Sequence, residues 1–304
     1  MLYPISFSVH ESKILSSVPA KTQLLAKIVP GQLHTYIYQN EVDYYAEYQR
    51  SLFAITTEKG GMDCLRHYEI LANGCIPLFH GIESCPVRTL FNFPKEIIVR
   101  AKALYHELST VPDPFHYGSA HLIEACRGVT NELLTYSREH LTNRAVASYI
   151  LQASGNHDAS RILFLCGITQ VDYLPFLTVS GFKDLFGTGC HEYPKMEPIY
   201  SDYSGPLLSL YGKGMTYSRV VDASLRDDSL DASIRDDIIA KKYDCIVYGS
   251  LHRGTPFLDL VSEHYPSDKI IMCCGEDKNG CCHAVDGYSM PDPDHHLFVR
   301  ELRV

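Results

Sequence analysis

The segment Ser51–Phe79 constrains the fold more than any other part of the chain. It begins with an apolar stretch of strand length, Leu52–Ile55, and continues through a loop that contains two adjacent glycines, Gly60 and Gly61. A short helical pattern follows, and a second apolar stretch, Cys75–Phe79, comes directly after it. Two buried strands joined by a helix predict a parallel pair with the helix on one face of the sheet.

The loop and the helix of this unit have the composition of an anion site. A glycine-bearing turn that leads into a helix leaves unpaired N–H groups and the positive end of the helix dipole where phosphate groups bind well. The polar helix residues Arg66, Glu69 and Asn73 share one face, and the face opposite carries Leu65, Tyr68 and Ala72. We expect the apolar face to pack on the sheet. Arg66 then faces a cleft and can bind a diphosphate, while Glu69 can bind the hydroxyl pair of a ribose.

The string Arg66-x-x-Glu69-x-x-x-x-Gly74-Cys75-Ile76-Pro77 resembles the donor-binding half of GT-B glycosyltransferases, closest to the exostosin-like group. The resemblance covers roughly residues 1–100. It implies that Glu69 holds the ribose of a nucleotide sugar, that Arg66 or the helix N-terminus holds the diphosphate, and that the nucleotide is UDP. The commoner retaining GT-B pattern has another Glu eight residues before the helix Glu. Here Gly61 stands at that position, and the nearest acid upstream is Glu58.

We therefore expect a donor-binding set of six residues: Glu58, Lys59, Gly60, Gly61, Arg66 and Glu69. The alternative is a structural Arg–Glu pair on an exposed helix, which would contribute about 0.2–0.5 kcal/mol. Two tyrosines of an expected strand over His34–Tyr38, Tyr36 and Tyr38, can stack on a base. Tyrosines in strands are more often simply packed, and we prefer that interpretation here.

The length and charge of the chain exclude several classes of protein. A chain of 304 residues suits two domains of about 150 residues each, or one large α/β domain. A net charge of −9 argues against nucleic acid or an anionic membrane as a partner, because both need basic patches. No apolar run approaches the ~20 residues of a membrane span, and the N-terminus lacks the regions of a signal peptide. Cysteines within apolar strands, such as Cys75 and Cys166, fit reduced thiols better than a disulfide framework. We expect a soluble cytoplasmic protein, encoded by a virus or a microbe, of undetermined oligomeric state.

The second half of the chain has an α/β pattern of its own. We expect buried strands over Ile162–Cys166, Asp244–Tyr248 and Ile270–Cys274, separated by helices. The carboxyl ends of parallel strands are the places where ligand-binding residues gather. The loops after these strands contain five candidates: Asp172, His252, Arg253, Glu276 and Asp277. Asp172 can alternatively cap the helix that follows it.

Two α/β domains with a cleft between them are the GT-B arrangement. We predict an α/β fold of two Rossmann-like domains of this type, with a donor domain and a helical segment over residues 1–155 and an acceptor-side domain over residues 156–304. The donor half then comes first, which is a permuted order. The alternative is a plain tandem of unrelated Rossmann units.

Transfer of a sugar to a hydroxyl group with inversion needs a general base from the domain that faces the donor. We expect this base among Asp172, His252 and Glu276, with Arg253 and Asp277 on the acceptor side. We expect no essential metal and no cofactor beyond the nucleotide sugar. The helix dipole and an arginine would neutralise the leaving diphosphate instead.

Three further patterns are not assigned to the site. Cys and His residues gather between Cys273 and His296 but lack the C-x-x-C spacing of a zinc site. The D-x-D string at Asp292–Asp294 lies in a Pro-rich tail rather than beside the donor loop. The segment Ala223–Asp228 is nearly repeated at Ala232–Asp237, and its many charges predict a solvated helix face.

The sequence thus predicts a glycosyltransferase that moves a sugar from a nucleoside diphosphate to a hydroxyl group of a glycan. Neither the P-loop string G-x-x-x-x-G-K-[ST] nor the dinucleotide fingerprint G-x-G-x-x-G occurs. Their absence disfavours a P-loop NTPase and a dinucleotide oxidoreductase. Another nucleotide-dependent transferase or hydrolase stays open, as does a non-catalytic two-domain protein that clamps a nucleotide or a glycan.

Overall fold

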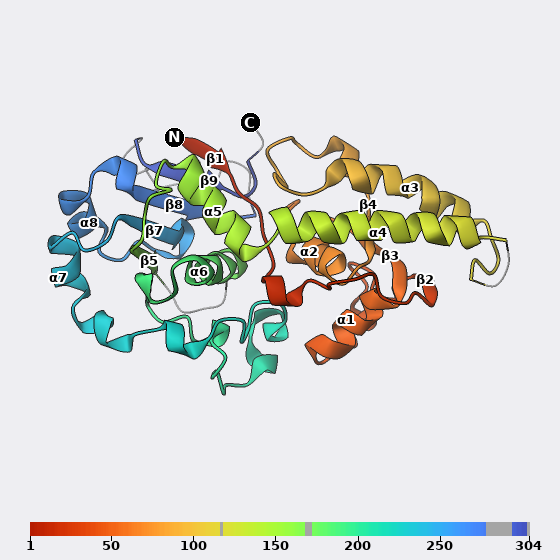
Figure 1. Cartoon of the computed structure of the whole chain (residues 1–304), viewed down its shortest axis with the longest axis horizontal. Coiled ribbons are helices and arrows are strands. Elements are labelled where there is room, and N and C mark those ends of the chain that lie inside the picture. Colours follow the sequence, from red (N-terminus) through yellow and green to blue (C-terminus); the bar gives the residue numbers. More distant parts are fainter. Residues whose placement is uncertain (116–117, 168–171, 278–293, 303–304) are drawn as a thin grey trace.

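The computed structural model describes residues 1–115, 118–167, 172–277 and 294–302. Its named strands form two separate sheets, and every pairing in them is parallel. The six-stranded sheet has the order β1-β9-β8-β7-β5-β6, and the three-stranded sheet has the order β2-β3-β4. Figure 1 shows the two sheets toward opposite ends of the molecule. The protein is therefore α/β, with two parallel sheets that are compatible with Rossmann-like folds.

The three-stranded half contains the predicted strand–helix–strand unit. Its elements are β2 (Gln23–Leu25), α1 (Glu41–Gln49), β3 (Ser51–Thr56), α2 (Leu65–Ala72), β4 (Ile76–Phe79), α3 (Lys95–Ser109) and α4 (Ala120–His140). The helix α2 stops before Gly74, whose φ of 61° suits glycine. The strand expected over His34–Tyr38 is wrong, since a 3-10 turn occupies Leu33–Thr35. The hydroxyl of Thr35 donates to the carbonyl of Gln32 at 2.7 Å, and such local bonds compete with sheet pairing.

The six-stranded half is built mainly from the rest of the chain. Its elements are β1 (Leu2–Pro4), α5 (Asn143–Ala153), β5 (Ile162–Cys166), α6 (Tyr173–Phe186), β6 (Cys190–Tyr193), α7 (Ile234–Ile239), β7 (Cys245–Ser250), α8 (Leu258–His264), β8 (Ile270–Cys274) and β9 (His296–Val299). The predicted central strands correspond to β5, β7 and β8. All of their residues are buried, which explains their continuous apolar sequences.

The N-terminal strand lies in the sheet of the second half, because β1 pairs with β9 through Tyr3 and Phe298. The chain then builds the three-stranded half and returns through α4 and α5, as Figure 1 shows. The helix α5 packs against α6 of the six-stranded half. The division of the chain at residue 155 therefore does not coincide with the division between the sheets.

The strand order of the larger sheet reverses beside β5. From β5 the chain adds β6 on one side, and it then returns to add β7, β8 and β9 on the other side. In open parallel sheets such a reversal leaves a crevice at the carboxyl ends of the two strands on either side of it, and ligands bind there. The crevice of this sheet lies at the ends of β5 and β7.

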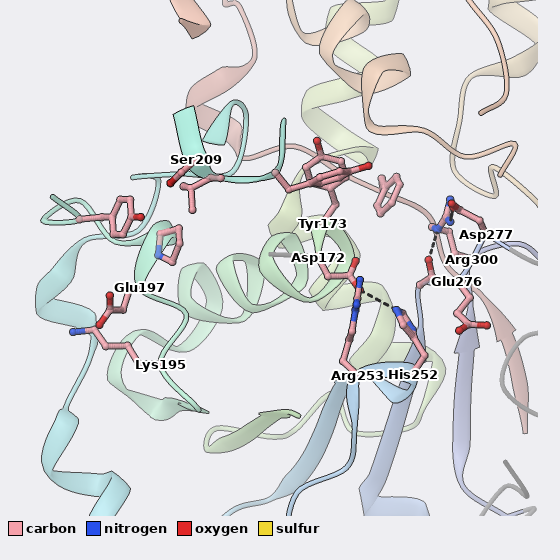
Figure 2. A pocket seen from close by; sticks show the side chains of 16 residues that line it. Asp172, Tyr173, Lys195, Glu197, Ser209, His252, Arg253, Glu276, Asp277 and Arg300 are labelled. Carbon is pink, nitrogen blue, oxygen red and sulfur yellow. Dashed lines mark hydrogen bonds and ion pairs between the residues drawn. The ribbon is translucent and has the colours of Figure 1, made fainter. Parts of the chain in front are cut away.

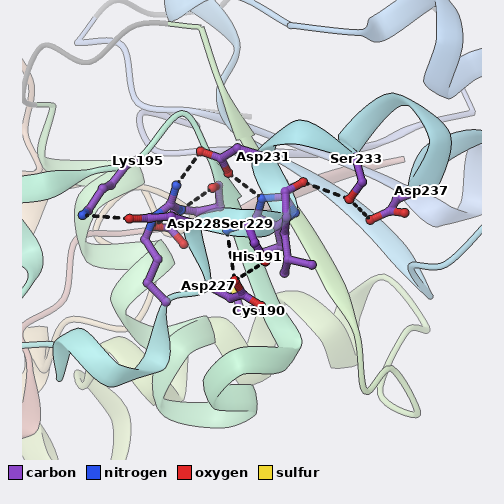
Figure 3. Close-up of polar contacts among 12 residues, drawn as sticks. Cys190, His191, Lys195, Asp227, Asp228, Ser229, Asp231, Ser233 and Asp237 are labelled. Atoms are coloured by element: carbon purple, nitrogen blue, oxygen red, sulfur yellow. Dashed lines mark hydrogen bonds and ion pairs between the residues drawn. The ribbon is translucent and has the colours of Figure 1, made fainter.

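The first copy of the charged near repeat is not a solvated helix face, so the prediction is wrong there, whereas the second copy runs into α7, where Arg235 and Asp236 are exposed. The first copy lies in short 3-10 turns, and the side chain of Arg226 is only 4% exposed. Arg226 pairs with Glu192 of β6 and with Asp231, each at 2.8 Å. Figure 3 shows the neighbouring contacts of Asp231 with His191 and of Lys195 with Asp228. A buried carboxylate on β6 needs cationic partners, and the repeat supplies one.

No helix in the part of the chain that the structure describes is long and apolar enough to cross a membrane. Cys75, Cys245 and Cys273 are buried and reduced, as expected. Cys274, in contrast, is disulfide-bonded, so the prediction of reduced thiols is wrong at that position.

Candidate functional site

Two adjoining cavities lie between the halves of the molecule. The larger has a volume of about 1200 Å³ and lies at the carboxyl edge of the six-stranded sheet. The smaller, of about 350 Å³, lies beside α2. Four residues line both cavities: Phe7, Tyr173, Tyr211 and Asp277. The cavities therefore form one continuous cleft, which is the arrangement expected for two facing α/β units.

The smaller cavity is lined by tyrosines and cations. Tyr36, Tyr38 and Tyr44 contribute aromatic walls from the three-stranded half. The guanidinium of Arg66 lies 5.3 Å from the ring centre of Tyr36. Tyr36 and Tyr38 pack partly against a core cluster, as we expected, but they also border the cavity, where their rings are open to a ligand.

Three cations face this cavity: Lys59, Arg66 and Lys213. Within the described residues, none of them has a carboxylate at ion-pair distance. The Nε atom of Arg66 is buried and has no hydrogen-bond partner there. The Lys213 ammonium donates only to neutral acceptors, the Tyr38 carbonyl at 2.7 Å and the Gln39 side chain at 2.9 Å. These positive charges attract anions.

Glu69 also borders the smaller cavity, but it does not pair with Arg66, so the structural pair considered as an alternative is not formed. Its two carboxylate oxygens accept from the Tyr44 hydroxyl at 2.7 Å and from the Thr216 hydroxyl at 2.5 Å. Burial raises the pKa of Glu69, and these hydrogen bonds only partly oppose the effect. Asn73, expected on the same face, is buried and bonds to Gln49 instead.

Two of the N–H groups that follow the glycines of the loop are occupied by a side chain of the other half. The N–H groups of Met62 and Asp63 donate to the carboxylate of Glu301, at 3.1 and 2.9 Å. A Cβ atom on Gly61 would lie 2.3 Å from Glu301 Oε1, and one on Gly60 would lie 2.0 Å from Asp277 Oδ2. The two glycines thus admit carboxylates of the other half. Glu58 and Gly61 border neither cavity.

Arg300, at the end of β9, joins the two halves beneath the cleft. Its side chain is 1% exposed and donates to the carbonyl of Gly275 at 3.0 Å, to the carbonyl of Asp63 and to the carboxylate of Asp277. It also pairs with Glu301 at 3.0 Å. Burial raises the pKa of Asp63 to about 7 although Arg300 lies nearby. The ion pair with Arg300 thus holds the acceptor-side candidate Asp277 in place.

The larger cavity brings together Asp172, His252 and Arg253. Figure 2 shows the side chains of His252 and Arg253 beside Asp172, whose Oδ2 atom lies 3.1 Å from His252 Nε2 and 3.1 Å from Arg253 Nε. The carboxylate makes no N-cap hydrogen bond, so the structural alternative for Asp172 is not formed. Burial alone would raise the pKa of Asp172, but the hydrogen bonds from His252 and Arg253 hold it below its ordinary value.

The topology explains this cluster. Asp172 follows β5 and His252 follows β7, so both lie at the crevice where the strand order reverses. The Ser250 hydroxyl lies 3.2 Å from His252 Nδ1, and Ser250 is fully buried. An imidazole held by a carboxylate can accept a proton from a hydroxyl group that enters the cavity. Burial keeps Ser250 from acting as a nucleophile on a ligand.

Glu276 also borders the larger cavity, and the described structure gives it no hydrogen bond or ion pair. The opposite wall contains residues that sequence analysis did not single out, including Lys195, Glu197 and Tyr203. Sequence analysis also missed Lys213, which the neighbouring glycines in Gly212-Lys213-Gly214 could have indicated as a loop cation. Nothing in the sequence indicates Glu301 or Arg300 as part of the site.

No protein-family model, no curated protein and no solved structure matches the chain. The class that the structure supports is an α/β protein with a cleft between two parallel sheets. Across the described residues, no group of three or more His, Cys, Asp or Glu is arranged to hold a metal ion. Cys281, Cys282, His283 and Asp292 lie outside those residues.

Proposed function

We propose that the protein is a glycosyltransferase of GT-B type with its donor half first, which moves a sugar from UDP to a hydroxyl group of a glycan. The observation that supports this proposal is the smaller cavity, where Lys59, Arg66 and Lys213 lack carboxylate partners among the described residues. Cations of this kind bind phosphate oxygens, and tyrosine rings stack on bases. A volume of about 350 Å³ lies in the range of small-ligand sites.

In this proposal Arg66 and Lys213 hold the diphosphate while Tyr36 contacts the base. Both oxygens of Glu69 already accept one hydrogen bond. A carboxylate has about four acceptor positions, so two are left for ribose hydroxyls. The loop N–H groups of Met62 and Asp63 take no part, since Glu301 accepts from them.

The reaction would take place where the cavities meet, beside Tyr173 and Tyr211. An acceptor hydroxyl in the larger cavity transfers its proton to His252 as its oxygen bonds to the anomeric carbon. The bond from that carbon to the diphosphate breaks, and the cations of the smaller cavity stabilise the charge of the leaving group. Asp172 positions His252, Arg253 holds Asp172, and Glu276 is the second candidate base.

The test is a thermal-shift panel of UDP, GDP, CDP and ADP, with and without EDTA. A ligand at 100 times its Kd adds roughly 2.7 kcal/mol to the free energy of unfolding. We expect UDP to stabilise the protein selectively, with no effect of EDTA. Arg66→Met should abolish the shift, and Arg100→Met, which removes an exposed ion pair with Glu132, should preserve it. No shift with any nucleotide would refute the proposal.

A second assay separates an enzyme from a binding protein. Release of UDP from a panel of UDP-sugars is measured with oligosaccharide acceptors, for the wild type and for His252→Gln. Selective UDP binding without turnover would favour a non-catalytic protein that clamps a nucleotide or a glycan between its halves.

A further inference from the structure

Residues 207–219 form a strap that crosses from the six-stranded half onto the three-stranded half. Lys213 bonds to the Tyr38 carbonyl, and the N–H of Thr216 donates to the carboxylate of Glu41 at 2.6 Å. The strap borders both cavities, with Leu210 on the larger, Tyr211 on both and Lys213 on the smaller. It therefore lies over the place where the two cavities meet.

The backbone of the strap is strained. Positive φ values between 56° and 77° occur at Gly212, Lys213, Gly214, Thr216 and Arg219. Glycine adopts this conformation easily, whereas a β-branched residue such as Thr216, with a φ of 77°, rarely does. Strain of this kind persists only where other contacts hold the residue in place, and it is common in segments that switch between two states.

Three polar contacts hold Thr216. The residue is fully buried, and its hydroxyl donates to Glu69 Oε1 at 2.5 Å and lies 2.8 Å from the Tyr45 hydroxyl. The third contact is the hydrogen bond that the N–H of Thr216 donates to the carboxylate of Glu41. The first part of the strap is exposed, with the side chains of Leu208 and Tyr211 at 60% and 57%, whereas Tyr217, next to Thr216, is fully buried. The bonds of Thr216 therefore oppose the strain and keep the strap closed.

We propose that the strap is a gate of the smaller cavity and that the hydrogen bond from Thr216 to Glu69 is its latch. Opening breaks that bond, relieves the strain at Thr216 and widens the entrance beside Lys213. The strap's role as a gate for a nucleotide rests on the proposed function, because Glu69 is also the proposed ribose-binding group. A nucleotide that binds Glu69 then competes with Thr216, so that entry and movement of the strap are coupled.

A thiol inside the cavity allows the gate to be tested without a nucleotide. Cys64 is reduced, half-buried and borders the smaller cavity. Cys85 is also reduced and half-buried but borders neither cavity, so it serves as an internal control. The ligand-free full chain is treated with iodoacetamide at one fixed pH near 9, and the labelling rate of each cysteine is followed by peptide mass spectrometry.

Two variants at one position separate the latch from side-chain shape. Thr216→Val keeps the shape and loses the hydroxyl, whereas Thr216→Ser keeps the hydroxyl. We expect Thr216→Val to raise the labelling rate of Cys64 by roughly tenfold, because the variant loses a hydrogen bond to a charged group. In Thr216→Ser the labelling rate of Cys64 should equal that of the wild type. The labelling rate of Cys85 should be unchanged in both variants. An unchanged rate at Cys64 in Thr216→Val would overturn the proposal.

Unfolding has a different signature, because the buried Cys75 would be labelled together with Cys85. If Thr216→Val does not fold, Tyr45→Phe removes one partner of the Thr216 hydroxyl and should raise Cys64 labelling by a smaller factor. A wild-type rate in that variant would then refute the gate. Failure of UDP to bind any variant would count against the proposed function alone, since the labelling of Cys64 does not depend on it.

Discussion

The two cavities of the cleft share four lining residues but differ in how their cations are paired. In the smaller cavity the described cations Lys59, Arg66 and Lys213 lack carboxylate partners. In the larger cavity the arginines are paired, Arg253 with Asp172 and Arg300 with Asp277. Its Glu276 has no partner in the described structure. One cavity is therefore suited to an anionic group, and the other to a neutral, hydroxylated group that gives up a proton.

The difference also reflects how each cavity is made. The smaller cavity takes Arg66 and Glu69 from a single face of α2, and it adds a loop and the strap. The larger cavity takes Asp172 and His252 from the ends of two neighbouring strands. A helix face presents residues that are close in sequence. A crevice between parallel strands brings together residues that are far apart in sequence, and it is the more reliable place to look for a reactive group.

The substitution expected to have the largest effect is at His252, and it should affect the transfer rate without affecting nucleotide binding. His252→Gln removes the proposed base, and the transfer rate should fall by roughly 10²- to 10⁴-fold. The affinity for UDP should stay within about twofold, because the nucleotide binds in the other cavity. Transfer kinetics and a binding isotherm measure the two quantities. Equal losses of affinity and rate would contradict the assignment of nucleotide binding to the smaller cavity and of proton transfer to the larger one.

Removal of Arg300 should destabilise the boundary between the cavities. Arg300→Met leaves Glu301 buried and without its cation, which is expected to cost about 3–5 kcal/mol of the free energy of unfolding. Arg100→Met, the matched change in an exposed pair, should cost less than about 1 kcal/mol. Urea denaturation of both variants gives the comparison. Similar costs would show that the buried network contributes no more than a surface pair.

The buried Asp63 should make the same boundary sensitive to pH. The pKa of Asp63 is raised to about 7, whereas an unfolded aspartate titrates near 3.9. Its contribution to stability is therefore fully present below about pH 4 and is lost as the pH rises toward 7. The advantage of Asp63→Asn over the wild type should grow by on the order of 4 kcal/mol between pH 4 and pH 8. Urea denaturation at the two pH values measures this difference. An equal difference in the free energy of unfolding at pH 4 and at pH 8 would exclude this role of Asp63.

The smallest expected effect concerns Lys213. Lys213→Met should weaken UDP binding by about tenfold or less, as expected for one partly exposed phosphate contact. Uridine, which has no phosphate, should bind the variant and the wild type alike. Calorimetric titration with both ligands distinguishes a phosphate contact from a general loosening of the strap, because loosening would change both affinities together.

Much of the fold could be predicted from local patterns. The strands β3, β4, β5, β7 and β8 follow from short apolar stretches, and α2 follows from its polar and apolar faces. The pairing of β1 with β9 could not be predicted, since it joins the two ends of the chain. The loss of the expected strand over His34–Tyr38 depends on hydrogen bonds within a turn, which apolar patterns do not report.

The residues of the candidate site also fall into those that the sequence predicts and those that only the tertiary structure reveals. The sequence by itself determined that Arg66 and Glu69 share a helix face and that Asp172 and His252 follow strands, because periodicity and strand ends are local properties. Only the tertiary structure decided that Glu301 accepts from the N–H groups of Met62 and Asp63, and that the strap brings Lys213 to the smaller cavity and Thr216 to Glu69. Those contacts join segments more than a hundred residues apart in sequence. Their partners are chosen by packing and by charge once the halves meet.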